Sequence, residues 1–412
     1  MSRFLYLFII IAAIVLVVLV GYYLRYRPGA APSGTTSGTL PGAQNQNIQQ
    51  NPASPTGSQT PQQAGLPSAS GTFGLVAQNP AADFFVDREN NVIIVQPDGQ
   101  VVKVTKGEPV VLSSSVIAGL ISAEFSYDGK KVLASFGDPS APQASVFDVA
   151  SKSWQPLPLG AESAVWSPTS HQIAYFKEGA DYKSLLVLNV SKTTTKPQEL
   201  AKLRVQDVSL NWVRQSHILL VEKSSAAVTG AMWMYDTASG KLTLVSEGLG
   251  LQSFWNETST NVGLVFSAAR SGHGGILSLI DALGNVVKRL RLATLPSKCA
   301  FGREQTMPQT SDAASSSSPN ASGSSDVLYC AVPRDANAFS KARLPDDYSK
   351  KALFTADDLY KIDLSQGNIM PIFNDESQLF DASNLKVFGQ NLFFVNRLDS
   401  KVYAVSLGSN HE

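Results

Sequence analysis

The sequence predicts an all-β fold, a seven-bladed β-propeller preceded by one N-terminal transmembrane helix and a disordered linker. Short runs of β-branched and aromatic residues recur through residues 72–412, and their length and composition are typical of strands. The runs also repeat at a regular interval. Phe125, Trp166, Trp212, Trp255 and Phe301 align with one another and are 41, 46, 43 and 46 residues apart. Four strands in about 40–45 residues is the period of a propeller blade.

The chain begins with an apolar run over residues 4–24 that predicts a transmembrane helix. At about 1.5 Å per residue it spans roughly 31 Å, which matches a hydrocarbon core of about 30 Å. Tyrosine and arginine residues at positions 22–27 suit the membrane interface. A cleaved signal peptide is the alternative, but the run is long for one and no small-residue cleavage site follows closely. We therefore expect residues 1–27 to be a retained signal anchor.

The orientation of this anchor does not follow from the flanking charges. Arg3 and the terminal amine precede the run, whereas Arg25 and Arg27 follow it. A two-residue tail before the run and one large domain after it is the common form of a signal anchor, and large domains cross with little regard to charge. We expect a single-pass protein of the cytoplasmic membrane with the propeller on the extracytoplasmic side.

Residues 28–71 predict a disordered linker. They consist mainly of Pro, Gly, Ser, Thr, Gln and Asn, with almost no large apolar residue. Such a segment buries too little surface to offset the entropy of ordering it. As a coil it reaches roughly 35–40 Å, so we expect it to hold the propeller near the membrane.

The propeller is expected to occupy residues 72–412, with each blade built in the same order. The aligned aromatic residue lies on the first strand, and a polar turn and a second strand follow. The third strand ends in a residue that starts a turn, and a fourth strand returns. The turn-starting residues are Asp148, Asn189, Asp236, Asp281 and Asp363. The predicted blades are residues 79–112, 121–157, 161–200, 208–245, 251–290, 299–372 and 383–407. Six or eight blades stay open, because only three short runs indicate the first one.

Two further expectations concern pairing within the ring. The last predicted blade lacks its outermost strand, and residues 72–77 are expected to supply it and so remove an exposed edge. Cys299 and Cys330 are the two cysteines of the chain and fall on neighbouring strands of the sixth blade. A disulfide joins them if the register matches, and two free buried thiols are the alternative.

Two of the blades carry a family resemblance. Residues 125–134 read Phe-Ser-Tyr-Asp-Gly-Lys-Lys-Val-Leu-Ala, and residues 166–175 read Trp-Ser-Pro-Thr-Ser-His-Gln-Ile-Ala-Tyr. They resemble the WD40-like PD40 repeats of TolB-type propellers, whose motif is an aromatic residue, Ser-Pro-Asp-Gly and a β run. The other blades lack the Pro, Asp and Gly. The resemblance implies a propeller in an extracytoplasmic bacterial setting and carries over no functional residue. No TolB role is implied, because the N-terminal TolB domain is missing.

The sequence predicts no enzyme, cofactor or metal site. The histidines His171, His217, His273 and His411 have no zinc-ligand spacing, and no nucleophile elbow or complete dinucleotide loop occurs. The formal net charge is zero, which argues against a nucleic-acid partner.

The sixth blade has two inserts of different character. Residues 303–325 are Ser-rich and predict a disordered loop between the first and second strands. Residues 333–357 mix aromatic and charged side chains, predict a small structured lobe between the second and third strands, and suit a protein partner. A lobe that covers the blade edge is the alternative. The candidate partner-binding residues are Arg334, Phe339, Arg343, Asp346, Asp347, Tyr348 and Phe354.

These observations predict a membrane-tethered extracytoplasmic propeller that acts as a binding or scaffolding module for protein partners in the cell envelope. One alternative is a carbohydrate-active propeller enzyme, because its carboxylates would come from separate blades and leave no local motif. A sensor that binds wall polymer is another alternative. The identity of the partner does not follow from the sequence.

Overall fold

The computed structural model describes residues 73–105, 108–192, 195–255, 262–305 and 324–407. The predicted anchor and linker, residues 1–27 and 28–71, lie outside these ranges, as do residues 306–323 of the Ser-rich insert. Within the described ranges, no helix combines the length and the apolar character needed to cross a membrane.

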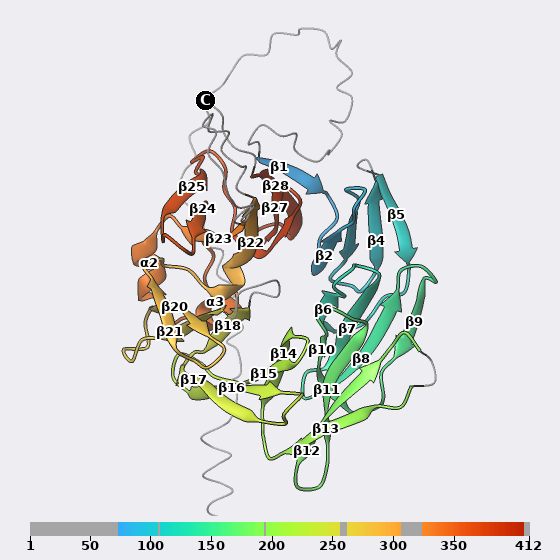
Figure 1. Cartoon of the computed structure of the whole chain (residues 1–412). Coiled ribbons are helices and arrows are strands. Elements are labelled where there is room, and N and C mark those ends of the chain that lie inside the picture. Colours follow the sequence, from blue (N-terminus) through green and yellow to red (C-terminus); the bar gives the residue numbers. More distant parts are fainter. Residues whose placement is uncertain (1–72, 106–107, 193–194, 256–261, 306–323, 408–412) are drawn as a thin grey trace, which may run out of the picture. The chain divides into compact units, whose positions relative to one another are not determined.

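The described residues form seven four-stranded antiparallel sheets around a common centre (Figure 1). The prediction of an all-β, seven-bladed propeller is therefore confirmed. Blade 1 consists of β2 (Asp83–Val86), β3 (Val92–Val95), β4 (Val101–Thr105) and β5 (Glu108–Ser113). Blade 2 consists of β6 (Leu120–Phe125), β7 (Lys131–Asp138), β8 (Ala141–Asp148) and β9 (Ser153–Pro156). Blade 3 consists of β10 (Ala161–Trp166), β11 (Gln172–Glu178), β12 (Lys183–Asn189) and β13 (Gln198–Leu203).

Blades 4 to 7 follow in the same order. Blade 4 consists of β14 (Val208–Arg214), β15 (His217–Glu222), β16 (Thr229–Asp236) and β17 (Leu242–Leu249), and blade 5 of β18 (Gln252–Trp255), β19 (Val262–Ala268), β20 (Gly275–Asp281) and β21 (Val286–Leu290). Blade 6 consists of β22 (Cys299–Gln305), β23 (Ser324–Pro333), β24 (Asp357–Asp363) and β25 (Ile369–Phe373). Blade 7 consists of β26 (Ala382–Phe388), β27 (Asn391–Asn396), β28 (Lys401–Ser406) and β1 (Phe73–Ala77). In each blade the first strand is innermost, while outer strands such as β5 are largely exposed.

Apolar packing joins each blade to the next. Seven clusters of buried side chains occur in the described residues, and each draws on two neighbouring blades. One of them packs Phe84 of blade 1 against Phe393 of blade 7, which closes the ring. Because strands buried on both faces must be apolar throughout, β3 is a continuous run of buried valine and isoleucine.

The ring is also closed by backbone pairing. β1 pairs antiparallel with β28, so the outer strand of the last blade comes from the other end of the propeller sequence. Phe73 on β1 stacks on Phe373 with ring centroids 5.0 Å apart and on Tyr403 at 5.3 Å. The predicted role of residues 72–77 in closure is confirmed for β1.

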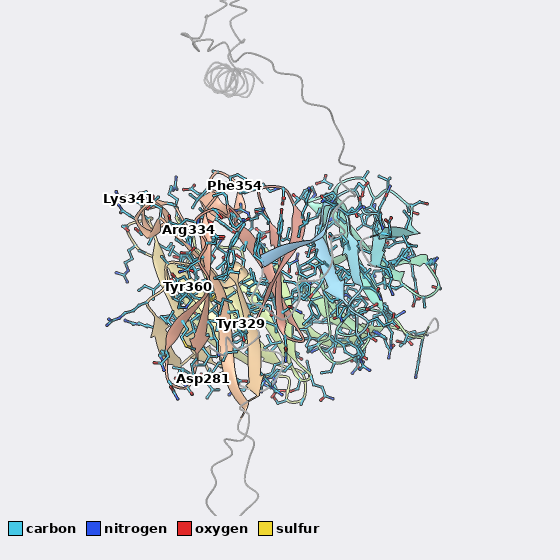
Figure 2. All side chains as sticks on the ribbon, turned by 90° about the horizontal axis from the view of Figure 1, so that it is seen from above. Asp281, Tyr329, Arg334, Lys341, Phe354 and Tyr360 are labelled. Carbon is cyan, nitrogen blue, oxygen red and sulfur yellow. A yellow bond between two sulfur atoms is a disulfide. The ribbon has the colours of Figure 1, made fainter. Side chains whose placement is uncertain are left out.

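The third strands end as predicted, in side chains that start turns. The Asp148 carboxylate accepts hydrogen bonds from the backbone N–H groups of Ala150 and Ser151. The carboxylates of Asp236, Asp281 and Asp363 accept from backbone N–H groups two residues further on in the same way. These aspartates are therefore turn residues on the rim of the propeller, where Figure 2 shows Asp281.

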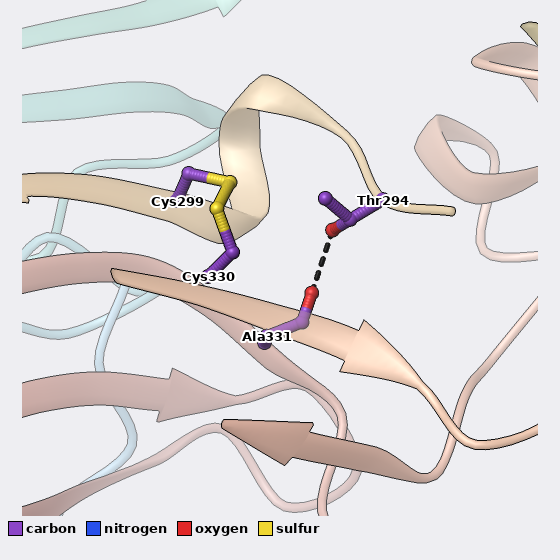
Figure 3. Close-up of a disulfide and its surroundings, with 4 residues drawn as sticks. All are labelled: Thr294, Cys299, Cys330 and Ala331. Carbon is purple, nitrogen blue, oxygen red and sulfur yellow. Dashed lines mark hydrogen bonds between the residues drawn. A yellow bond between two sulfur atoms is a disulfide. The ribbon is translucent and has the colours of Figure 1, made fainter. Parts of the chain in front are cut away.

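In blade 6 the two cysteines face each other. Cys299 on β22 is the register partner of Cys330 on β23, and the structure joins them by a disulfide (Figure 3). Both residues are buried. Nearby, the Thr294 hydroxyl donates a 2.6 Å hydrogen bond to the Ala331 carbonyl, which ties the segment before β22 to β23.

The insert between β23 and β24 contains two short helices, α2 (Ala336–Lys341) and α3 (Asp346–Ser349). Asp335 caps α2, because its carboxylate accepts a hydrogen bond from the Ala338 N–H. Another short helix, η1 (Pro296–Lys298), precedes β22. Figure 2 shows Arg334 and Phe354 at the edge of the propeller opposite Asp281. We call residues 334–356 the lobe.

Candidate functional site

Two pockets lie along the inner strands of the ring. The smaller has a volume of 270 Å³ and the larger a volume of 550 Å³, and Phe254 on β18 lines both. We call them the tryptophan pocket and the wide pocket. The tryptophan pocket is lined by Glu124, Phe125, Tyr127, Val165, Trp166, Ser167, Pro168, Asn211, Trp212, Val213, Ser253, Phe254 and Trp255.

The tryptophan pocket owes its lining to the alternation of side chains along each inner strand. Trp212 and Trp255 end in the core between blades, so the residue just before each of them turns the other way, toward the channel. Asn211 precedes Trp212, and Glu124 occupies the same position before Phe125. Glu124 and Asn211 are exposed while the aromatic residues are buried. The channel lining is thus set by the position preceding the aligned aromatic residue.

Some polar groups in the walls of this pocket lack hydrogen-bond partners. The Trp166 indole N–H donates to the Glu124 carbonyl of the preceding blade at 3.0 Å. The corresponding indole N–H groups of Trp212 and Trp255 find no partner among the described residues, nor does the Ser253 hydroxyl. Because buried polar groups are nearly always paired, these walls hold unused hydrogen-bonding capacity.

The wide pocket lies between blades 1, 5, 6 and 7 and the lobe. Its only charged lining residues are Lys351 and Arg397, and no carboxylate lines it. Polar lining comes from hydroxyl and amide side chains. The lining residues are Ala81, Ala82, Gln252, Phe254, Pro296, Ser297, Cys299, Tyr348, Ser349, Lys351, Ser383, Asn384, Leu385, Val395, Arg397 and Ser400. Of these two cations, Arg397 is paired with the buried Asp381 carboxylate, so Lys351 is the lining residue that makes the pocket suit an anionic group.

Arg397 is fixed in the wall of the wide pocket. Its guanidinium donates to the Asp381 carboxylate at 2.6 Å and to the Tyr348 carbonyl at 2.7 Å. The same group lies over the Tyr348 ring, 3.7 Å from its centroid, and 4.8 Å from that of Phe354. Stacking, these two hydrogen bonds and a third to the Leu353 carbonyl at 3.3 Å hold the planar guanidinium in one orientation.

A buried ionic network lies beneath this wall. The Lys298 ammonium is 2.7 Å from a carboxylate oxygen of both Asp357 and Asp381, and all three side chains are fully buried. The Tyr348 hydroxyl donates to Asp381 at 3.1 Å. Two carboxylates, one ammonium and the Arg397 guanidinium balance in charge, as burial requires. The network joins the lobe, through Tyr348, to blades 6 and 7.

Burial and neighbouring charges shift pKa values in this network. Burial alone would lower the pKa of Lys298, but the negative charge of Asp357 and its neighbours outweighs burial and raises it. Burial raises the pKa of Tyr348 to about 12. Lys298 is therefore charged and Tyr348 neutral near pH 7, whereas burial raises the pKa of the Asp357 carboxyl.

The lobe residues named from the sequence play different parts. Phe339 and Tyr348 are buried in the cluster between blades 5 and 6, and Tyr348 also lines the wide pocket. The Asp346 carboxylate accepts from the Ala226 N–H, and the Asp347 carboxylate accepts from the Arg343 N–H. Arg334 pairs with Asp358, and Phe354 is 45% exposed. The lobe is thus tied to the blades, and its binding of a partner stays a prediction.

Sequence reasoning did not find Glu124, Lys298, Asp381 or Arg397. Glu124 was detectable in principle, because the residue before each aligned aromatic faces the channel. Lys298 and Asp381 are 83 residues apart, and no local pattern links them. In the described part of the chain no group of His, Cys, Asp and Glu could hold a metal ion.

Similarity to known proteins is found among solved structures. No family model matches the chain, and no curated protein matches it. Among solved structures, the chain is similar to the tricorn protease at 13% identity, with a TM-score of 0.46 over 83% of this chain and 34% of that protein. A structure from work on two prolyl endopeptidases gives 12% identity, a TM-score of 0.46, and coverage of 81% and 50%.

A third similar structure is the β-propeller domain of the Trilobed protease from Pyrococcus furiosus. It gives 10% identity and a TM-score of 0.39, with coverage of 68% of this chain and 77% of that one. The chain spans half or less of the length of the first two proteins. At these identities and TM-scores the likeness assigns no activity to this chain.

The sequence-based prediction of function is corrected at this point. A pure binding or scaffolding module for protein partners was expected, whereas these similar structures are peptidases or their propeller domain. The structure also places its pockets in the channel and packs the lobe against the blades. We retain neither the scaffold function nor the two alternatives given with it.

Proposed function

We propose that this chain is a non-catalytic propeller that binds peptides in its central channel. The observation that carries the proposal is the wide pocket, which has two cationic lining residues, Lys351 and Arg397, and no anionic one. A volume of 550 Å³ falls within the range of roughly 300–1,000 Å³ that small-molecule sites occupy. A peptide with a carboxylate end matches both the charge and the size.

The other lining residues suit a peptide backbone. Ser297, Ser383 and Ser400 bring hydroxyl groups that can donate to carbonyl oxygens or accept from N–H groups. Phe254 and Leu385 provide apolar surface for side chains. Pockets that combine apolar walls with a few polar groups are the usual form of ligand sites.

The proposal assigns binding to this chain and bond cleavage to a separate active site. No histidine lines either pocket, and the lining Cys299 is held in a disulfide. We include in the proposal that the bound peptides are substrates or products of a separate peptidase. The chain would then select peptides by their ends.

The test is peptide binding by the full-length chain, measured by calorimetry with short peptides that carry a free or an amidated carboxyl end. The proposal predicts that amidation weakens binding about tenfold, since one charge-assisted contact is lost. Lys351→Met should remove this difference, while Lys152→Met, on the exposed β8–β9 turn, should keep it. Peptides that fail to bind in every form would contradict the proposal. After the peptide has been incubated with the chain, mass spectrometry should find the peptide uncut.

We also propose that residues 4–24 anchor the chain in a membrane, with the propeller on the extracytoplasmic side. The length of the apolar run supports this, and so does the resemblance of two blades to PD40 repeats of TolB-type propellers. A disulfide between Cys299 and Cys330 suits an oxidising compartment. Protease added outside intact spheroplasts should cut the propeller. Protection that is lost only on lysis would contradict this placement.

A further inference from the structure

Lys351 lines the wide pocket and is exposed, and no carboxylate among the described residues pairs with it. The proposed recognition of a carboxylate end therefore depends on where the Lys351 ammonium group is held. The residue lies just beyond the C-terminal end of α3, in the part of the lobe that leads back to β24. We call residues 348–355 the lysine turn.

Backbone hydrogen bonds within the lobe shape the lysine turn. Lys351 has a φ of +58°, in the left-handed region that residues other than glycine adopt only where their surroundings impose it. Its N–H donates to the Tyr348 carbonyl at 3.1 Å. The N–H groups of Ala352 and Leu353 donate to the Asp347 carbonyl at 2.8 and 3.0 Å. These bonds give the turn its conformation but do not attach it to a blade.

Arg397, which follows β27 of blade 7, attaches the lysine turn to that blade. Its guanidinium donates to the Tyr348 carbonyl at 2.7 Å, the same oxygen that accepts the Lys351 N–H, and to the Leu353 carbonyl at 3.3 Å. The guanidinium also lies over the Tyr348 ring and 4.8 Å from the centroid of the Phe354 ring. One side chain therefore contacts the turn on both sides of Lys351.

The Asp381 carboxylate, which is fully buried, holds Arg397 in place. One of its oxygens accepts from the Arg397 guanidinium at 2.6 Å and from the Thr355 N–H, at the end of the lysine turn, at 3.1 Å. The other oxygen lies 2.7 Å from the Lys298 ammonium. Buried charges paired in this way keep their geometry, because moving one leaves another uncompensated. The ionic network between blades 6 and 7 thus sets the position of the lysine turn.

The chemistry of arginine suits this task. A planar guanidinium offers five N–H donors in a fixed fork and stacks on aromatic rings, so one group can bond a carboxylate and two carbonyls together. A lysine ammonium in the same place would keep the charge but neither the fork nor the stacking. Because the charge of Arg397 is paired with Asp381, the ammonium of Lys351 is the group left to bind a carboxylate.

We infer that Arg397 is a positioning residue, which holds the lysine turn so that the Lys351 ammonium meets the carboxylate end of a peptide in the wide pocket. The inference rests on the proposed function and adds how the pocket distinguishes a free carboxyl end from an amidated one. Lys351 supplies the contact, and Arg397 acts on that contact through the turn.

The experiment uses calorimetry to compare a short peptide that has a free carboxyl end with its amidated form, each binding to the full-length chain. The unaltered chain should bind the free form about tenfold more tightly. In Arg397→Lys this preference should fall to about twofold, because the ammonium still pairs with Asp381 but releases the lysine turn. The affinity for the amidated form should stay the same. Hydrogen exchange over residues 348–355, followed by mass spectrometry, should be faster in Arg397→Lys.

Two variants are controls. Arg289→Lys makes the same substitution at an exposed position on the outer strand β21. Asp335→Ala removes the cap of α2 and so loosens the lobe outside the lysine turn. Both should keep the preference of about tenfold and the slow exchange of residues 348–355.

If Arg397→Lys does not fold, Phe354→Ala decides the question. The Phe354 ring is 45% exposed and lies beside the guanidinium, so its removal loosens Arg397 without opening the core. The preference should then fall to about threefold. An unchanged preference in the variant that folds would overturn this inference alone. An equal loss in Asp335→Ala would do the same, because loosening the lobe would then suffice. Failure of both peptide forms to bind the unaltered chain would overturn the proposed function and the inference with it.

Discussion

At the scale of single residues, Gly129 shows how one turn depends on the absence of a side chain. Its φ is +70°, and an added Cβ would lie 2.2 Å from the Phe85 ring of the neighbouring blade. Gly137 has a φ of +92°, but an added Cβ there would have no other atom within 4 Å. A substitution at Gly137 therefore measures the free-energy cost of the backbone conformation without a clash. Gly129→Ala should lower the free energy of unfolding by about 2–4 kcal/mol and Gly137→Ala by about 1–2. Urea unfolding measures both, and equal losses would contradict the predicted clash.

Asp128 links the same turn to the next blade. Its carboxylate accepts a 2.9 Å hydrogen bond from His171 Nε2 of blade 3. Burial raises the pKa of Asp128, but hydrogen bonds from His171, Lys130 and Ser126 outweigh burial and lower the pKa to about 2. A lowered carboxyl pKa contributes stability that is complete above the ordinary value of 3.8 and is lost as the pH falls toward 2.

Asp128→Asn should therefore lower the free energy of unfolding by about 1.5–3 kcal/mol at pH 7, the value of a hydrogen bond to a charged group. The difference from the unaltered chain should shrink as the pH falls from 4 to 2. Asp181→Asn, at an exposed position, is the control and should differ little at any pH. A difference that grows at low pH would show that Asp128 is not the stabilising carboxylate.

The residue scale also shows the limit of prediction from sequence. Asp148 and Asp236 were predicted as turn residues because an aspartate bonds its own backbone two residues on, which is a local property. Arg397 was not predicted, because its partners Asp381 and Tyr348 belong to different segments that only the closed ring brings together. Local chemistry can be read from the sequence, whereas contacts between blades cannot.

At the scale of elements, the disulfide between β22 and β23 makes a direct prediction. It closes a loop with a sequence separation of 31 residues. In the chain-entropy model such a bridge stabilises by about 3–4 kcal/mol, so Cys299→Ser with Cys330→Ser should lose about that much. Mass spectrometry of the alkylated, unreduced protein should find neither cysteine labelled. Two labelled thiols would contradict the bridge.

The elements of blade 6 were predicted only in part. The strands were predicted because their β-branched and aromatic runs are distinctive. The Ser-rich insert was expected from residue 303, but β22 continues to Gln305 and β23 begins at Ser324. The lobe was expected as a structured unit, yet its contribution of Tyr348 and Lys351 to the wide pocket depends on how it folds back over the channel. That path is a tertiary property.

At the scale of the whole molecule, closure by β1 is the feature most open to test. Two chains can be compared, one starting at residue 70 and one at residue 80, which lacks β1. The shorter should lose at least about 2 kcal/mol, the value of burying one phenylalanine, because Phe73 no longer packs and β28 becomes an exposed edge. Thermal unfolding measures the difference. Equal melting temperatures would contradict closure by β1.

The number of blades could be predicted because the period is repeated many times in the sequence, and each repeat adds evidence. The function could not be predicted in this way, because a pocket in the channel is lined by a few residues from each of several blades. Glu124 and Asn211 both line the tryptophan pocket but lie on different blades. A channel lining of this kind leaves no motif in any single repeat.

The central claim is that a peptide binds inside the channel. A short peptide with a photoreactive diazirine side chain, irradiated on the full-length chain and mapped by mass spectrometry, tests this claim most directly. The account predicts adducts on the inner strands β18 and β26 and on the lobe residues from Tyr348 to Lys351, because these line the two pockets. Adducts confined to outer strands such as β5, β17 and β21 would contradict it.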